Sequence, residues 1–154
     1  MSLYRQELTT TACDLTSAMM AQRIEPGALM IKDFDHVVLT TADLDKCLDF
    51  YTRVLGMRVE RFGAGRYALR FGDRKLNVHP PGFEAGLKAD KPTPGSLDLC
   101  FLADKPLTEV IEHLKTCNVT IIDGPGKRTG ARFDLRSVYV RDPDNNLVEI
   151  SEPY

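Results

Sequence analysis

The chain has 154 residues, 43% of them hydrophobic and 27% charged, with a formal net charge of −2 at pH 7. This composition is typical of an ordinary globular protein with one domain, or with two small halves that share a core. The near-balanced charge gives no electrostatic basis for binding nucleic acid or an anionic membrane. No apolar run approaches the roughly 20 residues that span a bilayer. We therefore expect neither nucleic acid nor a membrane as a partner.

Residues 1–31 are expected to be an N-terminal appendage. The stretch 8–24 has loose helical spacing, and the sequence EPG that follows it stops a helix. Glu7 and Asp14 and the lack of a continuous apolar core argue against a secretory signal. The four cysteines are widely spaced and form no CxxC pair, so we expect reduced thiols in a cytoplasmic protein. These cysteines are Cys13, Cys47, Cys100 and Cys117.

A first β-α-β-β-β module is predicted over residues 32–80. Residues 34–41, FDHVVLTT, are a β-branched run typical of a strand. Apolar residues recur at helical spacing in residues 42–57, and Gly56 stands at the expected C-terminal end of that helix. Three short strands follow, separated by glycine-containing turns. They are placed at residues 57–63, 66–72 and 75–80.

A linker over residues 81–94, rich in proline, glycine and charge, leads to a second module over residues 95–154. This module repeats the same order, with a helix predicted over residues 106–118. Its strands are placed at residues 96–103, 119–125, 134–142 and 146–152, with turns predicted at GPGKRTGAR (124–132) and DPDNN (142–146). A repeated unit of this size usually means two copies that bury a face against each other, which predicts an α+β fold of paired βαβββ modules.

Matching the two modules by strand position brings four candidate ligands into correspondence. Residues 35–40 align with residues 97–102, so that His36 matches Asp98. Residues 73–79 align with residues 144–149, so that His79 matches Glu149. If the two modules curve their sheets into one trough, strand alternation allows His36, His79 and Glu149 to converge inside it.

Two imidazoles and one carboxylate form the 2-His-1-carboxylate set used for Fe(II), which also suits Mn, Ni, Co or Zn. Three protein ligands leave positions open for water or substrate, as a catalytic metal requires. Asp98 is either a fourth, weaker oxygen ligand or an acceptor that orients a histidine ring. His113 lies on the second predicted helix and is expected to be a surface or packing residue. Candidate anion contacts are Arg61, Arg66, Arg70 and Arg128.

The chain resembles the vicinal oxygen chelate superfamily, the glyoxalase/bleomycin resistance/dioxygenase fold, over about residues 32–152. Three stretches carry the resemblance: DHVVLTTADLDKCLDFYTRVLGM, NVH and RDPDNNLVEISEP. Within this superfamily it is most similar to the group of glyoxalase domain-containing protein 5 and of bacterial lactoylglutathione lyase-like, virulence-associated proteins. The stretches GSLDLCF, HLK and RTGA point to that group.

The resemblance implies that the modules form a curved mixed-sheet cup around a divalent metal ion (Ni, Co, Zn, Mn or Fe(II)), which chelates adjacent oxygens of a substrate. Carried over by position, the metal ligands are His36, His79 and Glu149, with Asp98 as a further candidate. Glu149 is also the expected catalytic residue, as a proton carrier. A homodimer is expected, because paired modules expose sheet edges that this family commonly joins between subunits.

These features predict a metal-dependent, glyoxalase-like lyase or isomerase acting on a small oxygen-bearing substrate, such as a reactive aldehyde–thiol adduct. One alternative is an Fe(II)-dependent ring-cleaving dioxygenase, because a His/His/Glu set suits that metal. A second alternative is a binding or resistance protein that holds a small molecule without turnover.

Overall fold

The structure is a computed structural model that describes residues 30–84 and 86–154. Contacts divide the chain into two units, Met1–Asp33 and Phe34–Tyr154, and the second unit holds both predicted modules except residues 32–33 of the first. The expected appendage and Cys13 fall on residues 1–29, outside the described part, apart from the appendage's last two residues. No helix within the described ranges is long and apolar enough to cross a membrane.

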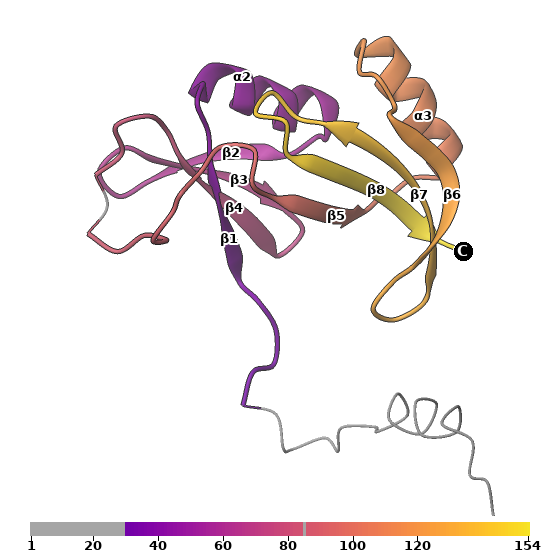
Figure 1. The fold of residues 1–154 in the computed structure, drawn as a ribbon, viewed down its shortest axis with the longest axis horizontal. Helices are drawn as coiled ribbons and strands as arrows, with labels where there is room; N and C mark the ends of the chain where they lie inside the picture. Colours follow the sequence, from indigo (N-terminus) through magenta and orange to yellow (C-terminus); the bar gives the residue numbers. More distant parts are fainter. Residues whose placement is uncertain (1–29, 85) are drawn as a thin grey trace, which may run out of the picture. The chain divides into compact units, whose positions relative to one another are not determined.

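The first module forms a four-stranded mixed sheet with the strand order β1-β4-β3-β2 (Figure 1). β1 (His36–Thr40) runs parallel to β4 (Arg74–His79). β3 (Arg66–Phe71) runs antiparallel to β4 and to β2 (Arg58–Phe62). All four strands lie within one or two residues of their predicted positions.

The predicted helix of this module is divided into two parts, α2 (Leu44–Asp49) and a π-helical turn, η1 (Phe50–Val54). Asp43 caps α2, because its side chain accepts a hydrogen bond from the backbone amide of Lys46. Gly56 follows with φ of +70°, a left-handed conformation that glycine adopts without strain, and ends the helical segment as expected.

The second module forms a sheet with the order β5-β8-β7-β6, which repeats the topology of the first. β5 (Asp98–Leu102) runs parallel to β8 (Leu147–Pro153), and β7 (Asp134–Arg141) is antiparallel to β8 and to β6 (Asp123–Thr129). α3 (Leu107–Thr116) connects β5 to β6, and Figure 1 shows α2 and α3 along the same side of the strands. The predicted α+β fold is therefore confirmed.

The position of β6 differs from the prediction, which placed this strand at residues 119–125 and a turn after it. The strand instead runs through the Gly124–Gly126 segment that was taken for the turn, with a register shift against β7 between Asp123 and Gly126. β6 is an edge strand, where a proline and a bulge are tolerated. Gly124 is needed there, because a Cβ atom would lie 2.4 Å from the carbonyl oxygen of Ser137.

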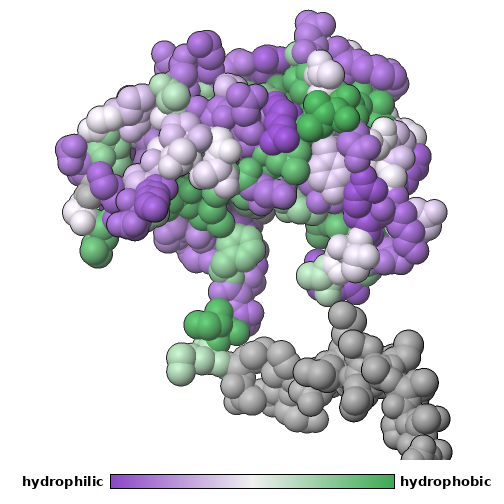
Figure 2. Space-filling model, in the orientation of Figure 1, coloured by the Kyte–Doolittle hydropathy of each residue, from purple (hydrophilic) through white to green (hydrophobic). Residues whose placement is uncertain are grey.

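The two modules share one hydrophobic core. Leu39, Leu76 and Val78 of the first sheet are buried in the same cluster as Val148 and Ile150 of the second. Helical side chains, including Cys47, Phe50, Tyr51, Leu107 and Leu114, complete this cluster. The helices therefore cover one face of the sheets. Some hydrophobic residues still reach the surface between hydrophilic ones, on the face drawn in Figure 2.

A buried polar group joins the first helix to the turn between β7 and β8. The Asp142 carboxylate is only 4% exposed and accepts a hydrogen bond from the Tyr51 hydroxyl (2.9 Å). It also accepts hydrogen bonds from the amide of Asp144 (3.0 Å), and from the amide and the Nδ2 group of Asn146 (2.8 and 2.7 Å). This carboxylate therefore sets the DPDNN turn and attaches it to the other module.

His113 makes a second contact between the modules. Its exposed ring lies on α3, and its Nε2 donates to the backbone carbonyl oxygen of Val54 at 3.1 Å. A proton on Nε2 is required for this bond, because a carbonyl oxygen only accepts. The prediction of a surface or packing role for His113 is confirmed.

Cys47 gives a first testable prediction. Cys47, Cys100 and Cys117 are free thiols, and burial raises the pKa of Cys47 to about 12. Alkylation requires the thiolate, so at pH 8 the native protein should react with iodoacetamide at Cys47 at least about 100-fold more slowly than the urea-unfolded protein. Peptide mass spectrometry over time measures both rates. Equal rates in the two states would contradict the burial of this thiol.

Candidate functional site

The predicted ligands lie on the sheet faces opposite the buried apolar residues. In the β1–β4 pair, His36 is aligned with Lys75, Val38 with Asn77, and Thr40 with His79. Side chains two residues apart in a strand share a face, and the residues between them, such as Leu39 and Val78, are those buried in the core. The face with the polar side chains is therefore the one available for chemistry.

The register corrects the predicted match between the modules. Asp98 is aligned with Leu147 in the β5–β8 pair, as His36 is with Lys75 in the β1–β4 pair, so His36 and Asp98 do occupy equivalent positions. Asn77, two residues beyond Lys75, corresponds to Glu149, and His79, four residues beyond Lys75, corresponds to Ser151. The match of His79 with Glu149 was therefore wrong by two residues.

The same register separates His79 from His36. The two residues lie at opposite ends of their paired strands, about 13 Å apart along the strand direction. Side chains stand roughly perpendicular to a sheet, so the two imidazoles stay far apart, whereas two ligands of one ion bring their donor atoms within about 4 Å. His36 is instead a diagonal neighbour of Asn77, as Asp98 is of Glu149.

His36 has the local arrangement of a metal-binding histidine. Its side chain is 44% exposed, and its Nδ1 lies 2.7 Å from the carboxylate of Asp35. This hydrogen bond is the main cause that lowers the pKa of Asp35. With the proton held on Nδ1, the Nε2 lone pair is left to bind a ligand, which is the arrangement that orients histidines at metal sites.

Asn77 was not among the predicted ligands. Its Oδ1 atom is buried and has no hydrogen-bond partner among the described residues. A buried amide oxygen without a partner is rare, because its desolvation costs about 1–3 kcal/mol. The signal was present in the sequence, since LNV (76–78) and VEI (148–150) share one alternation that places Asn77 at the position of Glu149.

Glu149 is partly buried and surrounded by hydroxyl groups. The Ser151 hydroxyl donates to its Oε1 atom at 3.2 Å, and Tyr139 lies directly opposite on β7. Burial raises the pKa of Tyr139, a hydrogen bond from Arg128 opposes this effect, and Glu149 adds to it. The Nε of Arg128 donates to the Tyr139 hydroxyl at 3.1 Å, which holds the tyrosine side chain on the strand position opposite Glu149.

The four predicted ligands are not assembled within one copy of the chain. Among residues 30–84 and 86–154, no three His, Cys, Asp or Glu side chains are grouped so that they could hold a metal ion. Asp98 is exposed at the start of β5, so its role as a ligand or an orienting group stays a prediction. The polar faces therefore present two separate pairs of donors, His36 with Asn77 and Asp98 with Glu149.

His79 lines a pocket of about 510 Å³ at the ends of β1 and β4. Its ring lies against that of Phe83, with 4.3 Å between centroids and an interplanar angle of 35°. Burial lowers the pKa of His79, and the nearby cations Arg66 and Lys88 lower it further. Four prolines line the same pocket, together with Thr40, Lys88 and Glu84.

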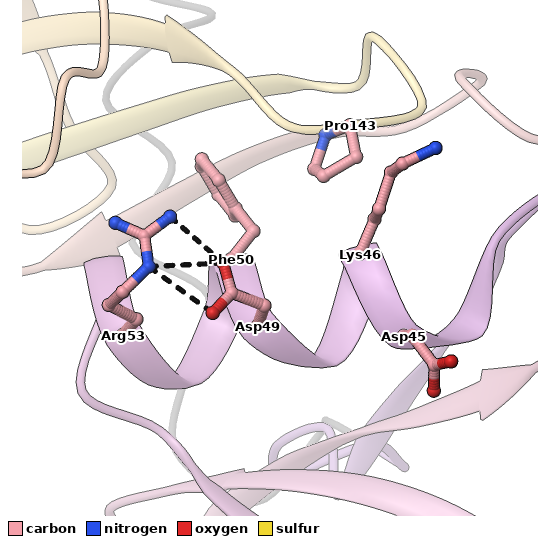
Figure 3. Close-up of a pocket in the computed structure, with 6 residues that line it drawn as sticks. All are labelled: Asp45, Lys46, Asp49, Phe50, Arg53 and Pro143. Carbon is pink, nitrogen blue, oxygen red and sulfur yellow. Dashed lines mark hydrogen bonds and ion pairs between the residues drawn. The ribbon is translucent and has the colours of Figure 1, made fainter.

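A shallower depression of about 390 Å³ lies where α2 and η1 face the β7–β8 turn, and Figure 3 shows its lining. Its charged groups pair with groups close by in the chain: Arg53 binds Asp49 at 2.8 Å, and Lys46 binds Asp43 at 2.8 Å. None of the predicted site residues lines it. We therefore assign it no chemistry.

Two mixed four-stranded sheets of identical topology, each with a helix between its first two strands, define an α+β protein of paired βαβββ modules. The chain belongs to the Glyoxalase/Bleomycin resistance protein/Dioxygenase superfamily, whose sequence pattern matches residues 33–150. The family that the motifs indicated is therefore confirmed.

Several relatives are similar over most of the chain. The Glyoxalase domain-containing protein RDO1 of Mycosarcoma maydis is 48% identical over 84% of this chain and 73% of its own. Virulence protein STM3117 of Salmonella typhimurium is 43% identical over 80% of this chain and 86% of its own. The crystal structure of STM3117 superposes with a TM-score of 0.80, at 42% identity over 82% of this chain and 100% of its own. An integron cassette protein from V. cholerae has a TM-score of 0.79 at 48% identity, over 80% of this chain and 97% of its own.

Proposed function

We propose that the protein is a metal-dependent, glyoxalase-like lyase or isomerase that acts on a small oxygen-bearing substrate. One observation carries this proposal. The two sheets hold equivalent pairs of diagonally neighbouring donor residues, His36 with Asn77 and Asp98 with Glu149. The chain's membership of the Glyoxalase/Bleomycin resistance protein/Dioxygenase superfamily supports this proposal.

The donors fit a divalent cation. The free Nε2 of His36, the unpartnered Oδ1 of Asn77 and the carboxylates of Asp98 and Glu149 supply one nitrogen donor and oxygen donors from three residues. Such an oxygen-rich set is harder than the predicted set with two imidazoles, and among Ni, Co, Zn, Mn and Fe(II) it favours Mn²⁺ or Fe²⁺. Asn77 takes the place proposed earlier for His79, because the register puts His79 out of reach of His36.

A second copy of the chain is proposed to complete the site. Each copy carries two half-sites: His36 with Asn77 on the first module, and Asp98 with Glu149 on the second. Each half-site lacks the donors that the other supplies. The surrounding faces expose hydrophobic side chains, with Val38 39% exposed on β1 and Leu102 49% exposed on β5. Pairing the first module of one copy with the second module of another would cover these side chains and close the expected cup, as a homodimer.

The residues of the chain have distinct proposed roles. Asp35 orients His36, and Ser151 and Tyr139 hold the carboxylate of Glu149 in position. Glu149 accepts a proton from a carbon atom beside the substrate carbonyl and returns it to the adjacent carbon, so that the substrate is isomerised without a net change in protons. The bound metal ion would polarise the oxygens on these two carbons.

Asn77→Leu separates the proposed role of Asn77 from a structural one. Leucine has a similar volume and removes a buried oxygen that has no partner, so the free energy of unfolding should rise by about 1 kcal/mol. The affinity for Mn²⁺ should fall at least about tenfold, because a donor is lost. Urea unfolding and a metal titration measure the two effects. A destabilised variant with unchanged metal affinity would assign Asn77 a purely structural role.

The proposed reaction is tested on the full chain after stripping and reloading with each of the five metals. We expect isomerisation of a methylglyoxal–thiol adduct with Mn²⁺ or Fe²⁺, followed by absorbance, and its loss in Glu149→Gln. Oxygen uptake with a catechol and Fe²⁺ would contradict the proposed isomerisation and support the dioxygenase alternative. Ligand binding without turnover under all conditions would replace it by the sequestration alternative.

A further inference from the structure

We infer that the pocket at the ends of β1 and β4 binds the carboxylate end of a small organic acid with an apolar body, and that His79 and Lys88 recognise the carboxylate. This inference rests on the proposed function for its link to the reaction, since it names the class of substrate that the metal site would receive. Binding to the pocket itself does not require the metal.

The walls of the pocket favour an apolar, flat body. The volume of about 510 Å³ suits a small ligand, and four prolines together with Phe83 form much of the lining. The ring of Phe83 lies 4.3 Å from that of His79, so the two rings make one aromatic wall. Proline and aromatic surfaces are rigid, and a planar ligand loses little entropy on lying against them.

The polar groups of the pocket favour a ligand with a negatively charged end. No hydrogen bond joins the ring nitrogens of His79 to any other described residue, so this ring is left with a donor for a ligand. Lys88 lines the pocket, and Arg66 acts on the same ring as a second nearby cation. Glu84 also lines the pocket, so the inferred carboxylate is bound by His79 and Lys88 in a lining that contains one acidic side chain.

The position of the pocket connects it to the proposed metal site. His79 lies two residues beyond Asn77 on the same face of β4, which is about 7 Å along the strand. Thr40 lies beside His79 on β1 and also lines the pocket. A small acid whose carboxylate binds His79 and Lys88 could therefore present oxygens at its other end to the donors around Asn77.

Benzoate is the probe, and benzamide, its neutral isostere, is the matched control. Each is titrated into the EDTA-treated full chain, and amide chemical shifts are followed by NMR. We expect saturable benzoate shifts at Thr41, Ala42 and Phe83, with benzamide at least about tenfold weaker. Lys88→Gln should weaken benzoate binding about fivefold and His79→Gln about threefold, whereas Lys91→Gln, an exposed linker lysine outside the pocket, should leave it unchanged.

Equal affinities for benzoate and benzamide, shifts confined to residues outside the pocket, or an unchanged affinity in Lys88→Gln would each overturn the inference. The spectra also report whether each variant is folded. His36→Ala distinguishes this inference from the proposed function, because it should lose metal binding and still bind benzoate. Benzoate binding without any metal binding in the wild-type chain would support the inferred binding pocket and contradict the proposed metal-dependent reaction.

Discussion

Asp142→Ala should lower the free energy of unfolding by about 3–5 kcal/mol, the largest effect that we expect from one substitution outside the site. The carboxylate accepts hydrogen bonds from Tyr51, from the amides of Asp144 and Asn146 and from the Asn146 side chain. Alanine leaves these donors in a site where Asp142 is only 4% exposed, and each unsatisfied buried group costs about 1–3 kcal/mol. Urea unfolding followed by circular dichroism measures the loss.

Two variants make this measurement specific. Tyr51→Phe removes one of the hydrogen bonds and leaves the carboxylate with its other donors, so it should cost about 1.5 kcal/mol. Asp45→Ala removes an exposed carboxylate on α2 and should change stability by less than about 0.5 kcal/mol. Equal effects for Asp142→Ala and Asp45→Ala would show that the DPDNN turn is not anchored through this carboxylate.

His36→Ala and Glu149→Ala should each lower the affinity for Mn²⁺ at least about 100-fold. Removing a group that only orients a ligand costs about 10–100-fold in metal affinity, and removing a ligand itself costs more. Asp35→Asn should therefore cost about tenfold, since Asp35 only orients His36. Isothermal titration calorimetry with Mn²⁺ on the metal-free protein measures these affinities.

The control for this series is Glu112→Ala, which removes an exposed carboxylate paired with Lys115 at 2.6 Å on α3. It should bind Mn²⁺ as the wild type does. All variants should keep their unfolding free energy within about 1 kcal/mol, because the exchanged groups are partly exposed. If His36→Ala and Glu149→Ala bind Mn²⁺ as tightly as Glu112→Ala, the proposed donors do not hold the metal.

Periodicity was sufficient to predict most of the fold. Strands such as β4 and β8 alternate apolar and polar residues, and the helical spacing after Asp43 ends at a glycine that takes a positive φ. β6 was misplaced because Gly124 and its proline neighbour signal a turn locally, whereas contact with β7 holds them in an edge strand. Local propensity cannot show such a tertiary constraint.

The candidate site was predicted in part. The equivalence of His36 and Asp98 follows from the starts of two similar strands and agrees with the strand register. His79 was predicted as a ligand because it was matched with Glu149, whereas the strand register places Asn77 at that position. The decisive property of Asn77, a buried oxygen without a partner, depends on packing and is visible only in the structure.

The most direct test of a site shared between two copies is to mix two variants that each lack one half-site. His36→Ala and Glu149→Ala, carrying different affinity tags, are co-refolded, and Mn²⁺ is titrated into the mixture. About half of the dimers should be mixed and each should hold one intact site, so about one quarter of the wild-type number of sites should return. Mixed dimers that are recovered through both tags but bind no Mn²⁺ would contradict a shared site, as would a chain that sediments as a monomer at micromolar concentration.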